Sequence, residues 1–501
     1  MKKFRHLFVV GLLLVFVAVA VMCNNKKPGE TTTLKNTTVI TPVNLPSVVP
    51  GFTFPQDSTA IFSWLNTPNT PGVYAHAWGI WAGLTAQSGQ VFQGDSILVY
   101  QTWQGINELV NLSSSSSTKM LTKENQVKRA RTLLSLPDQF ARTSLKNKLL
   151  QKGLSGKFTT GADDTAAFFV GVSYNPPSAA HVVNNGLLKQ SVQNVFLKTG
   201  SIGAIPAFPD SAINIKPVYY IGKQSDSLIR IPAWPGEPLI PHTFGSNVWN
   251  SYVYADVTNS QPKGKIPKPC RGILPTKAQI DSATCNVSDF INYKIDAATA
   301  NYINQQQGGT SFAAGDIALL VAMHVTTKEI SNWTWQTFYW APNPADPKLP
   351  SNQYAVNARP AQLKGAAAHY ALSVAYTEVM PNQPVSGGSA KNATPVIGYN
   401  PYLEAGFNPQ TFIDYPNAWK PNFKYGIQTN CMSCHALASP QDTVIAQIQG
   451  QPTVLDIYAT DQYVDMKSNY FKNKVLLDFA WSLRDNVIDD VSSKARSAKK
   501  K

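Results

Sequence analysis

Charged side chains are scarce in this sequence: Asp, Glu, Lys and Arg make up 14% of its 501 residues, against roughly a quarter in an average soluble domain. The formal net charge is nevertheless +14. No nucleic-acid-binding motif accompanies this basic excess, so we do not expect nucleic acid as a partner. A basic surface of this kind suits docking to acidic proteins or to anionic lipid.

Long hydrophobic runs are equally rare, and the clearest one begins the chain. Leu7–Met22 is an apolar or glycine run of 16 residues that follows Lys2, Lys3 and Arg5. It is short for a membrane-spanning helix and typical of a secretory signal, so residues 1–22 are predicted to be a signal peptide. The next apolar run, Ile317–Val325, is only long enough for a buried strand.

Two processing routes remain open for this signal. Ordinary cleavage could follow Ala20, in the small-x-small triplet that ends there. Cleavage before Cys23 would instead allow that cysteine to be lipidated as a membrane tether, although Met22 is an unusual residue at the position before it. Residues 23–52 are rich in Asn, Lys, Thr and Pro and predict a flexible linker. We therefore expect an exported protein, either periplasmic or anchored as a lipoprotein of the cell envelope.

Cysteine is also rare, with 5 residues in the chain, yet two of them stand in the pentapeptide Cys431-Met432-Ser433-Cys434-His435. This C-x-x-C-H pattern is the attachment signature of c-type haem. The two thiols would add to the haem vinyl groups, and the imidazole would be the proximal ligand of the iron. No second copy exists, so the sequence predicts one covalent haem c.

Other chemistries for the pair are less well supported. A zinc knuckle would need further ligands and usually a second cysteine pair, and a thioredoxin-like pair would need a βαβ context. A disulfide between Cys431 and Cys434 would leave His435 without a role. The remaining cysteines, Cys270 and Cys285, are predicted to form a disulfide of their own in an oxidising compartment.

The pattern of apolar segments predicts an α+β fold without regular βα alternation. We divide the chain into residues 1–22 (signal), 23–52 (linker), 53–385 (mixed body with short strands and Pro-rich loops), 386–490 (small α-helical, cytochrome c-like haem region) and 491–501 (basic tail). Predicted helices are Lys123–Leu134, Ala179–Leu197, Val287–Gln305, Gly365–Val379 and Phe471–Arg484. Predicted strands are Ser96–Trp103, Ala166–Tyr174, Ala212–Ile221, Ser227–Ala233, Asp316–Thr326 and Thr334–Trp340.

The second axial ligand of the iron is left open by the sequence. Met466 is the only soft ligand that follows the motif, and a Met/His pair would favour electron transfer. His324 and His369 in the body are further candidates. An open distal position would instead favour ligand binding or peroxide chemistry.

Several blocks outside the motif resemble a family of large, exported, mostly uncharacterised bacterial c-type cytochromes. They are Gly365–Tyr376, Tyr402–Phe407, Gly426–Asn430, Asp478–Leu483 and the segment from Met323 to Phe338. The resemblance implies one haem near the C-terminus, held by Cys431, Cys434 and His435, and implies no particular reaction.

Three functions are compatible with these features. The first is electron transfer in the cell envelope between redox partner proteins, with the body shielding the haem. The second is a haem-dependent redox enzyme, peroxidase-like or of another kind, which the large body favours because a simple carrier needs only about 100 residues. The third is a haem-based sensor. Common nucleotide-binding and hydrolase motifs such as G-x-G-x-x-G and G-x-S-x-G are lacking, so electron transfer is our preferred hypothesis.

Overall fold

The computed structural model describes residues 40–67, 70–114, 131–135, 168–237, 246, 249–272, 274–307, 309–404, 413–414, 430–441, 444–448, 451–455 and 458–491. The predicted signal peptide, Cys23 and most of the basic tail lie outside these residues. So does most of the helix predicted over residues 123–134.

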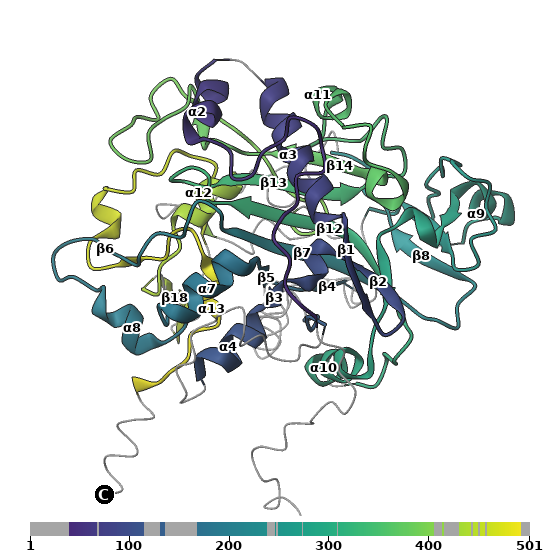
Figure 1. Cartoon of the computed structure of the whole chain (residues 1–501), viewed down its shortest axis with the longest axis horizontal. Coiled ribbons are helices and arrows are strands. Elements are labelled where there is room, and N and C mark those ends of the chain that lie inside the picture. The colour runs from purple at the N-terminus through teal and green to yellow at the C-terminus, as the bar shows by residue number, and fades with distance from the viewer. Residues whose placement is uncertain are drawn as a thin grey trace, which may run out of the picture.

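An antiparallel sheet forms the centre of the molecule (Figure 1). Its strands run in the order β14-β13-β12-β7-β5-β3, with β11 also paired to β12 and β4 to β7. The two longest strands, β7 (Ile213–Gly222) and β12 (Ile317–Thr327), lie side by side, and β13 (Thr334–Trp340) follows on the other side of β12. All seven residues of β13 are buried. The α+β class predicted from the sequence is confirmed.

Helix α3 (Thr70–Leu84) covers one face of this sheet. Trp81 stacks on Phe338 of β13 with ring centroids 4.4 Å apart. On its other side α3 meets the extended segment 40–52, and two glycines allow the close approach. A Cβ at Gly79 would lie 2.2 Å from the ring of Phe52, and one at Gly83 would lie 2.7 Å from the Pro46 carbonyl oxygen. This part of the predicted linker is therefore packed against the body.

The C-terminal part of the chain covers the opposite face. Trp335 and Phe338 are three residues apart on β13, so their side chains point to opposite faces of the sheet. Phe338 meets α3, whereas the Trp335 ring lies 4.3 Å from that of His435, in α12 (Cys431–Ala436). One hydrophobic cluster joins body residues such as Leu109 to Phe471 and others near the C-terminus. The C-terminal elements thus share their core with the body.

The remaining elements surround this centre. The described helices are α2 Ser58–Asn66, α3, α4 Ile106–Ser114, α7 Pro176–Asn184, α8 Gln190–Val195, α9 Lys277–Ala283, α10 Ala297–Gln307, α11 Gln353–Asn357, α12 and α13 Trp481–Asp485, with 3-10 turns at Val99–Thr102, Val287–Asp289, Gly365–His369 and Asn469–Phe471. The other strands are β1 Gln87–Phe92, β2 Asp95–Leu98, β3 Gln104–Gly105, β4 Phe168–Val170, β5 Ser173–Tyr174, β6 Gly203–Ala204, β8 Leu228–Pro232, β9 Tyr252–Asp256, β10 Thr284–Asn286, β11 Asn292–Lys294, β14 Tyr370–Val374, β15 Val379–Met380, β16 Thr394–Pro395, β17 Ile413–Asp414, β18 Val444–Ile448, β19 Gln451–Leu455, β20 Tyr458–Ala459 and β21 Val475–Leu476.

The longest predicted strands are confirmed, whereas several predicted helices are wrong. The structure has β7, β8, β12 and β13 within two residues of the predicted bounds. The predicted helix Gly365–Val379 is a 3-10 turn followed by β14, because pairing with β13 overrides the helix propensity of its alanines. The predicted helix Phe471–Arg484 is interrupted by left-handed residues at Asn473, Asp478 and Phe479, and only α13 remains of it.

Two further helix predictions each covered more than one element. The predicted helix Ala179–Leu197 divides into α7 and α8, with Gly186 in a left-handed conformation between them. Only the second half of Val287–Gln305 is helical, as α10.

The predicted disulfide between Cys270 and Cys285 is not formed, and both thiols are free and buried. Both cysteines lie beside strand β9 but belong to different hydrophobic clusters. Cys270 pairs with Tyr252 and packs with Tyr252 and Tyr254, whereas Cys285 pairs with Ala255 in the main core. Tyr252 and Ala255 are three residues apart on β9 and point to opposite faces, so the two sulfurs lie on opposite faces of this sheet.

None of the described helices combines the length and the apolar character that crossing a membrane requires.

Candidate haem-attachment site

The motif lies on α12, whose start is fixed by Asn430. The Asn430 side-chain oxygen accepts the amide N–H of Ser433 at 3.0 Å, which caps the first turn of the helix. Its side-chain nitrogen donates to the carbonyl oxygens of Thr377 at 2.8 Å and Glu378 at 3.3 Å, and also to that of Val396. A single buried side chain therefore starts the helix and attaches it to the chain around β15 and β16.

The short helix has one buried face and one face that carries the motif. Met432, Ser433 and Ala436 are buried, whereas Cys431, Cys434 and His435 are partly exposed. The sulfur of Met432 lies 2.9 Å from the side-chain nitrogen of Asn332, inside the body. Met432 therefore belongs to the buried face of α12.

Neither motif cysteine forms a disulfide, and the two lie one helical turn apart. The Cys431 sulfur lies 3.1 Å from the Gly398 carbonyl oxygen, and the Cys434 sulfur accepts the Thr460 amide at 3.2 Å. Burial, with a smaller contribution from the Glu404 carboxylate, raises the pKa of the Cys431 thiol well above its usual range. Cys431 is thus a neutral thiol at neutral pH.

The imidazole of His435 is oriented by a backbone carbonyl. Its Nδ1 donates to the Phe479 carbonyl oxygen at 2.7 Å, and because that oxygen can only accept, Nδ1 carries the ring proton. Burial lowers the pKa of His435 to about 4, so the ring is neutral at physiological pH. Within the described residues nothing hydrogen-bonds Nε2, whose lone pair is free to bind a metal. A ligand histidine commonly has this arrangement.

The Phe479 carbonyl is held in place by an unusual backbone. Asp478 and Phe479 have φ values of 46° and 69°, a left-handed conformation that costs non-glycine residues about 1 kcal/mol or more each. The Asp478 carboxylate accepts the Phe208 amide at 2.9 Å and the Lys328 ammonium at 2.5 Å. Burial lowers the pKa of Lys328, but its Asp478 partner favours the charged form. This buried ion pair therefore secures the bend that presents the carbonyl to His435.

A second pair of ionisable side chains, His324 and Glu404, lies on the same face of the sheet as Trp335. The His324 Nε2 and Glu404 Oε1 atoms are 2.7 Å apart, and the Asn400 amide donates to the other Glu404 oxygen at 2.5 Å. Lys216 is the register partner of His324 on β7. Burial alone would raise the pKa of Glu404, but His324 and these other groups lower it overall. Electrostatic interaction with His324 and Lys216 also contributes to the lowered pKa of His435.

The other sequence candidates for the distal ligand lie in different surroundings. The Met466 amide donates to the Val385 carbonyl oxygen at 3.2 Å, and its side chain packs on the hydrophobic cluster that contains Met432. Its role as a ligand stays a prediction. His369 lies 3.6 Å from a carboxylate oxygen of Asp289, and its Nδ1 is buried without a hydrogen-bond partner. His324 is the candidate that the fold places among the groups that act on His435.

Three important features could not be read from the sequence alone. The Phe479 carbonyl, the Lys328–Asp478 pair and the His324–Glu404 pair each come from segments far from the motif in the chain. Only Asn430 had a visible signal, because asparagine directly before a short helix is a preferred cap.

Comparison with known proteins gives no assignment: no protein-family model, no curated protein and no solved structure matches the chain. Across the described residues, no group of three or more His, Cys, Asp or Glu side chains is arranged to hold a metal ion.

Proposed function

We propose that the protein is an exported c-type cytochrome, which carries one covalent haem c on Cys431 and Cys434 and transfers electrons between redox partners in the cell envelope. The observation that carries the proposal is the state of His435. Its Nδ1–H is held by the Phe479 carbonyl at 2.7 Å and its ring is neutral, which leaves Nε2 for the iron.

The donor set fits a haem of this class. Two cysteines one turn apart, neither of them in a disulfide, and an adjacent oriented imidazole lie on the same partly exposed face of α12. A bound haem would supply an iron that changes between the ferrous and ferric states. The chain would hold the haem by its thiols and fix the proximal imidazole, while Trp335 packs against that ring.

The proposal is tested on the full chain produced with c-type haem maturation. We expect haem to remain on the denatured polypeptide and the reduced protein to show the sharp α-band of a c-type haem. The Cys431→Ala/Cys434→Ala variant should lose covalent haem, whereas Cys270→Ala/Cys285→Ala should keep it. Wild-type protein that releases all its haem on denaturation would refute the proposal.

A haem-dependent redox enzyme or sensor is the second candidate, and the His324–Glu404 pair favours it. The side chains of His324 and Glu404 are 20% and 21% exposed, so the pair could exchange protons with a bound substrate. A ferric haem that is high-spin and binds added ligands would support this candidate. A low-spin haem that Met466→Leu converts to high-spin, with Met380→Leu as a control at an exposed methionine, would support the electron carrier.

A further inference from the structure

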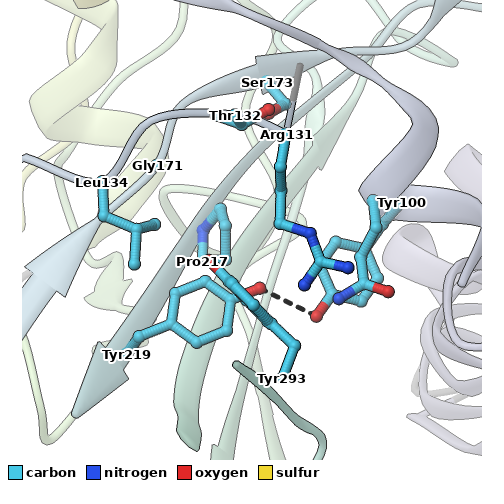
Figure 2. A pocket seen from close by; sticks show the side chains of 10 residues that line it. Tyr100, Arg131, Thr132, Leu134, Gly171, Ser173, Pro217, Tyr219 and Tyr293 are labelled. Atoms are coloured by element: carbon cyan, nitrogen blue, oxygen red, sulfur yellow. Dashed lines mark hydrogen bonds between the residues drawn. The ribbon is translucent and has the colours of Figure 1, made fainter. Parts of the chain in front are cut away.

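A small, partly open cavity, lined mainly by buried residues, lies in the body, away from the motif (Figure 2). Pro217 and Tyr219 of β7 line it. Pro217 is the neighbour of Lys216 on that strand, so it points to the face opposite the His324–Glu404 pair. The cavity has a volume of about 20 Å³. A single water needs roughly 10–15 Å³ measured in this way, so one or two heavy atoms fit.

Arg131 projects into this cavity and has no counter-ion among the described residues. Arg131 is 7% exposed, and its Nη1 is buried without a hydrogen-bond partner among the described residues. The guanidinium carbon lies 4.0 Å from the ring centre of Tyr293 and 5.2 Å from that of Phe92. Cation–π contacts of this kind offset only part of the cost of burying a charge. In the described parts of the chain no carboxylate pairs with Arg131.

The position of Arg131 is fixed by the chain that follows it. Ser135 and Val170 exchange two backbone hydrogen bonds of 2.8 Å, which attach the segment to β4. Figure 2 shows the guanidinium directed toward the hydroxyl groups of Tyr100 and Tyr219, with Tyr293 alongside.

The other polar groups of the cavity can donate hydrogen bonds. The Tyr100 and Tyr219 hydroxyls are 2.9 Å apart, so one of their two protons serves this bond and the other remains to be donated. The Gln101 side-chain oxygen already accepts the Leu98 amide at 2.9 Å, which leaves its NH₂ group. None of the described residues that line the cavity carries a carboxylate. Burial raises the pKa of Tyr219 and Tyr293 well above the usual range, so tyrosinate does not balance the arginine.

We propose that this cavity binds one small monovalent anion of halide size, such as chloride, which pairs with Arg131 and accepts hydrogen bonds from the surrounding tyrosine hydroxyls. An unpaired buried cation, a set of free donors and room for one or two heavy atoms together select such a ligand. Larger carboxylates and phosphates do not fit the volume. The ion would join the segment around Arg131 to β7 and β11, and would act as a structural counter-ion.

The test measures thermal unfolding of the haem-loaded full chain in sodium chloride and in sodium gluconate at equal ionic strength, since gluconate is too large for the cavity. We expect the Tm to rise with chloride concentration and not with gluconate, because a ligand of the folded state stabilises it. Arg131→Met should abolish the chloride effect. Arg230→Met is the matched control, because Arg230 also stacks on a tyrosine, Tyr252, at 3.5 Å but does not line the cavity.

Two further measurements keep the proposal falsifiable if Arg131→Met fails to fold. The Tyr100→Phe/Tyr219→Phe double variant removes the proton that this pair can donate and should weaken chloride binding by roughly tenfold to a hundredfold, the effect of one hydrogen bond to a charged group. Crystals grown in bromide should show anomalous scattering beside Arg131. A Tm that responds equally to both salts in the wild type, or a cavity that holds only water at high bromide concentration, would overturn the proposal.

Discussion

His76 and His435 show how differently one side chain can be used in the same molecule. His76 belongs to α3, on one face of the central sheet, and both ring nitrogens have partners: Tyr376 at 2.8 Å and Glu329 at 3.1 Å. His435 belongs to α12, on the other face, and among the described residues only its Nδ1 is bonded, to the Phe479 carbonyl. The first ring joins α3 to the segments that follow β12 and β14, whereas the second is oriented and has no described partner at Nε2. The difference separates a structural histidine from a candidate ligand without reference to sequence motifs.

The largest loss of stability is expected when the hydrogen bonds around His76 and Glu329 are broken. The side chains of His76 and Glu329 are 2% and 0% exposed, and Glu329 also accepts the Gln56 amide at 2.6 Å. Glu329→Ala should lower the free energy of unfolding by about 3–5 kcal/mol, because it leaves several buried donors unpaired. Urea unfolding measures this, and Glu329→Gln, which keeps an acceptor in place, should cost distinctly less. An alanine variant as stable as the wild type would mean that His76 is not a structural centre.

On the His435 side, the Lys328–Asp478 pair should have the next largest effect. The two side chains are 8% and 12% exposed, and Lys328→Met would leave the Asp478 carboxylate without its cation. We expect a loss of about 3 kcal/mol in urea unfolding, with a loosened Phe479 carbonyl.

The matched control for this variant is Lys277→Met. Lys277 pairs with Asp281 at 2.7 Å, but the side chains are 88% and 60% exposed, so the loss should stay below about 0.5 kcal/mol. If both variants lose equally little free energy of unfolding, the buried pair does not secure the bend at Asp478.

The motif itself could be predicted from sequence, because covalent attachment needs residues that are contiguous in the chain. Strand β13 could also be predicted, since every residue from Thr334 to Trp340 is buried and suited to a sheet. The bend at Asp478 and Phe479 could not, because residues with ordinary helix propensity adopt a left-handed backbone only through tertiary contacts with Lys328 and Phe208. The failed disulfide has the same cause, since sequence spacing does not reveal on which side of β9 each sulfur lies.

Glu378 allows a pH-dependent test on the His435 side of the comparison. This carboxyl is 7% exposed, and its oxygen accepts the Val464 amide at 2.6 Å. Burial raises the pKa of Glu378 from 4.5 to about 8. The folded state therefore keeps the proton at pH values where the unfolded chain has lost it. Its contribution to stability is complete below about pH 4.5 and disappears as the pH rises to about 8.

The measurement compares urea unfolding of the wild type with that of Glu378→Gln across this range. Between the two pKa values the wild type should lose up to about 1.4 kcal/mol per pH unit relative to the variant. Using the difference removes the contribution of His435, whose lowered pKa gives a slope of opposite sign between 6.5 and about 4. Parallel pH profiles would show that Glu378 is already ionised in the folded protein.

The smallest effects should distinguish the two histidines most directly. Tyr376→Phe removes the hydroxyl that bonds Nδ1 of His76, and Trp335→Phe removes an indole N–H that donates to Asn332 at 3.0 Å. Each loss should cost about 1 kcal/mol in urea unfolding. Only Trp335 packs on His435, with ring centroids 4.3 Å apart, so only Trp335→Phe should also shift the visible spectrum or midpoint potential of the haem-loaded protein. If Tyr376→Phe shifted the spectrum and Trp335→Phe did not, the assignment of the two histidines to structure and to ligation would have to be reversed.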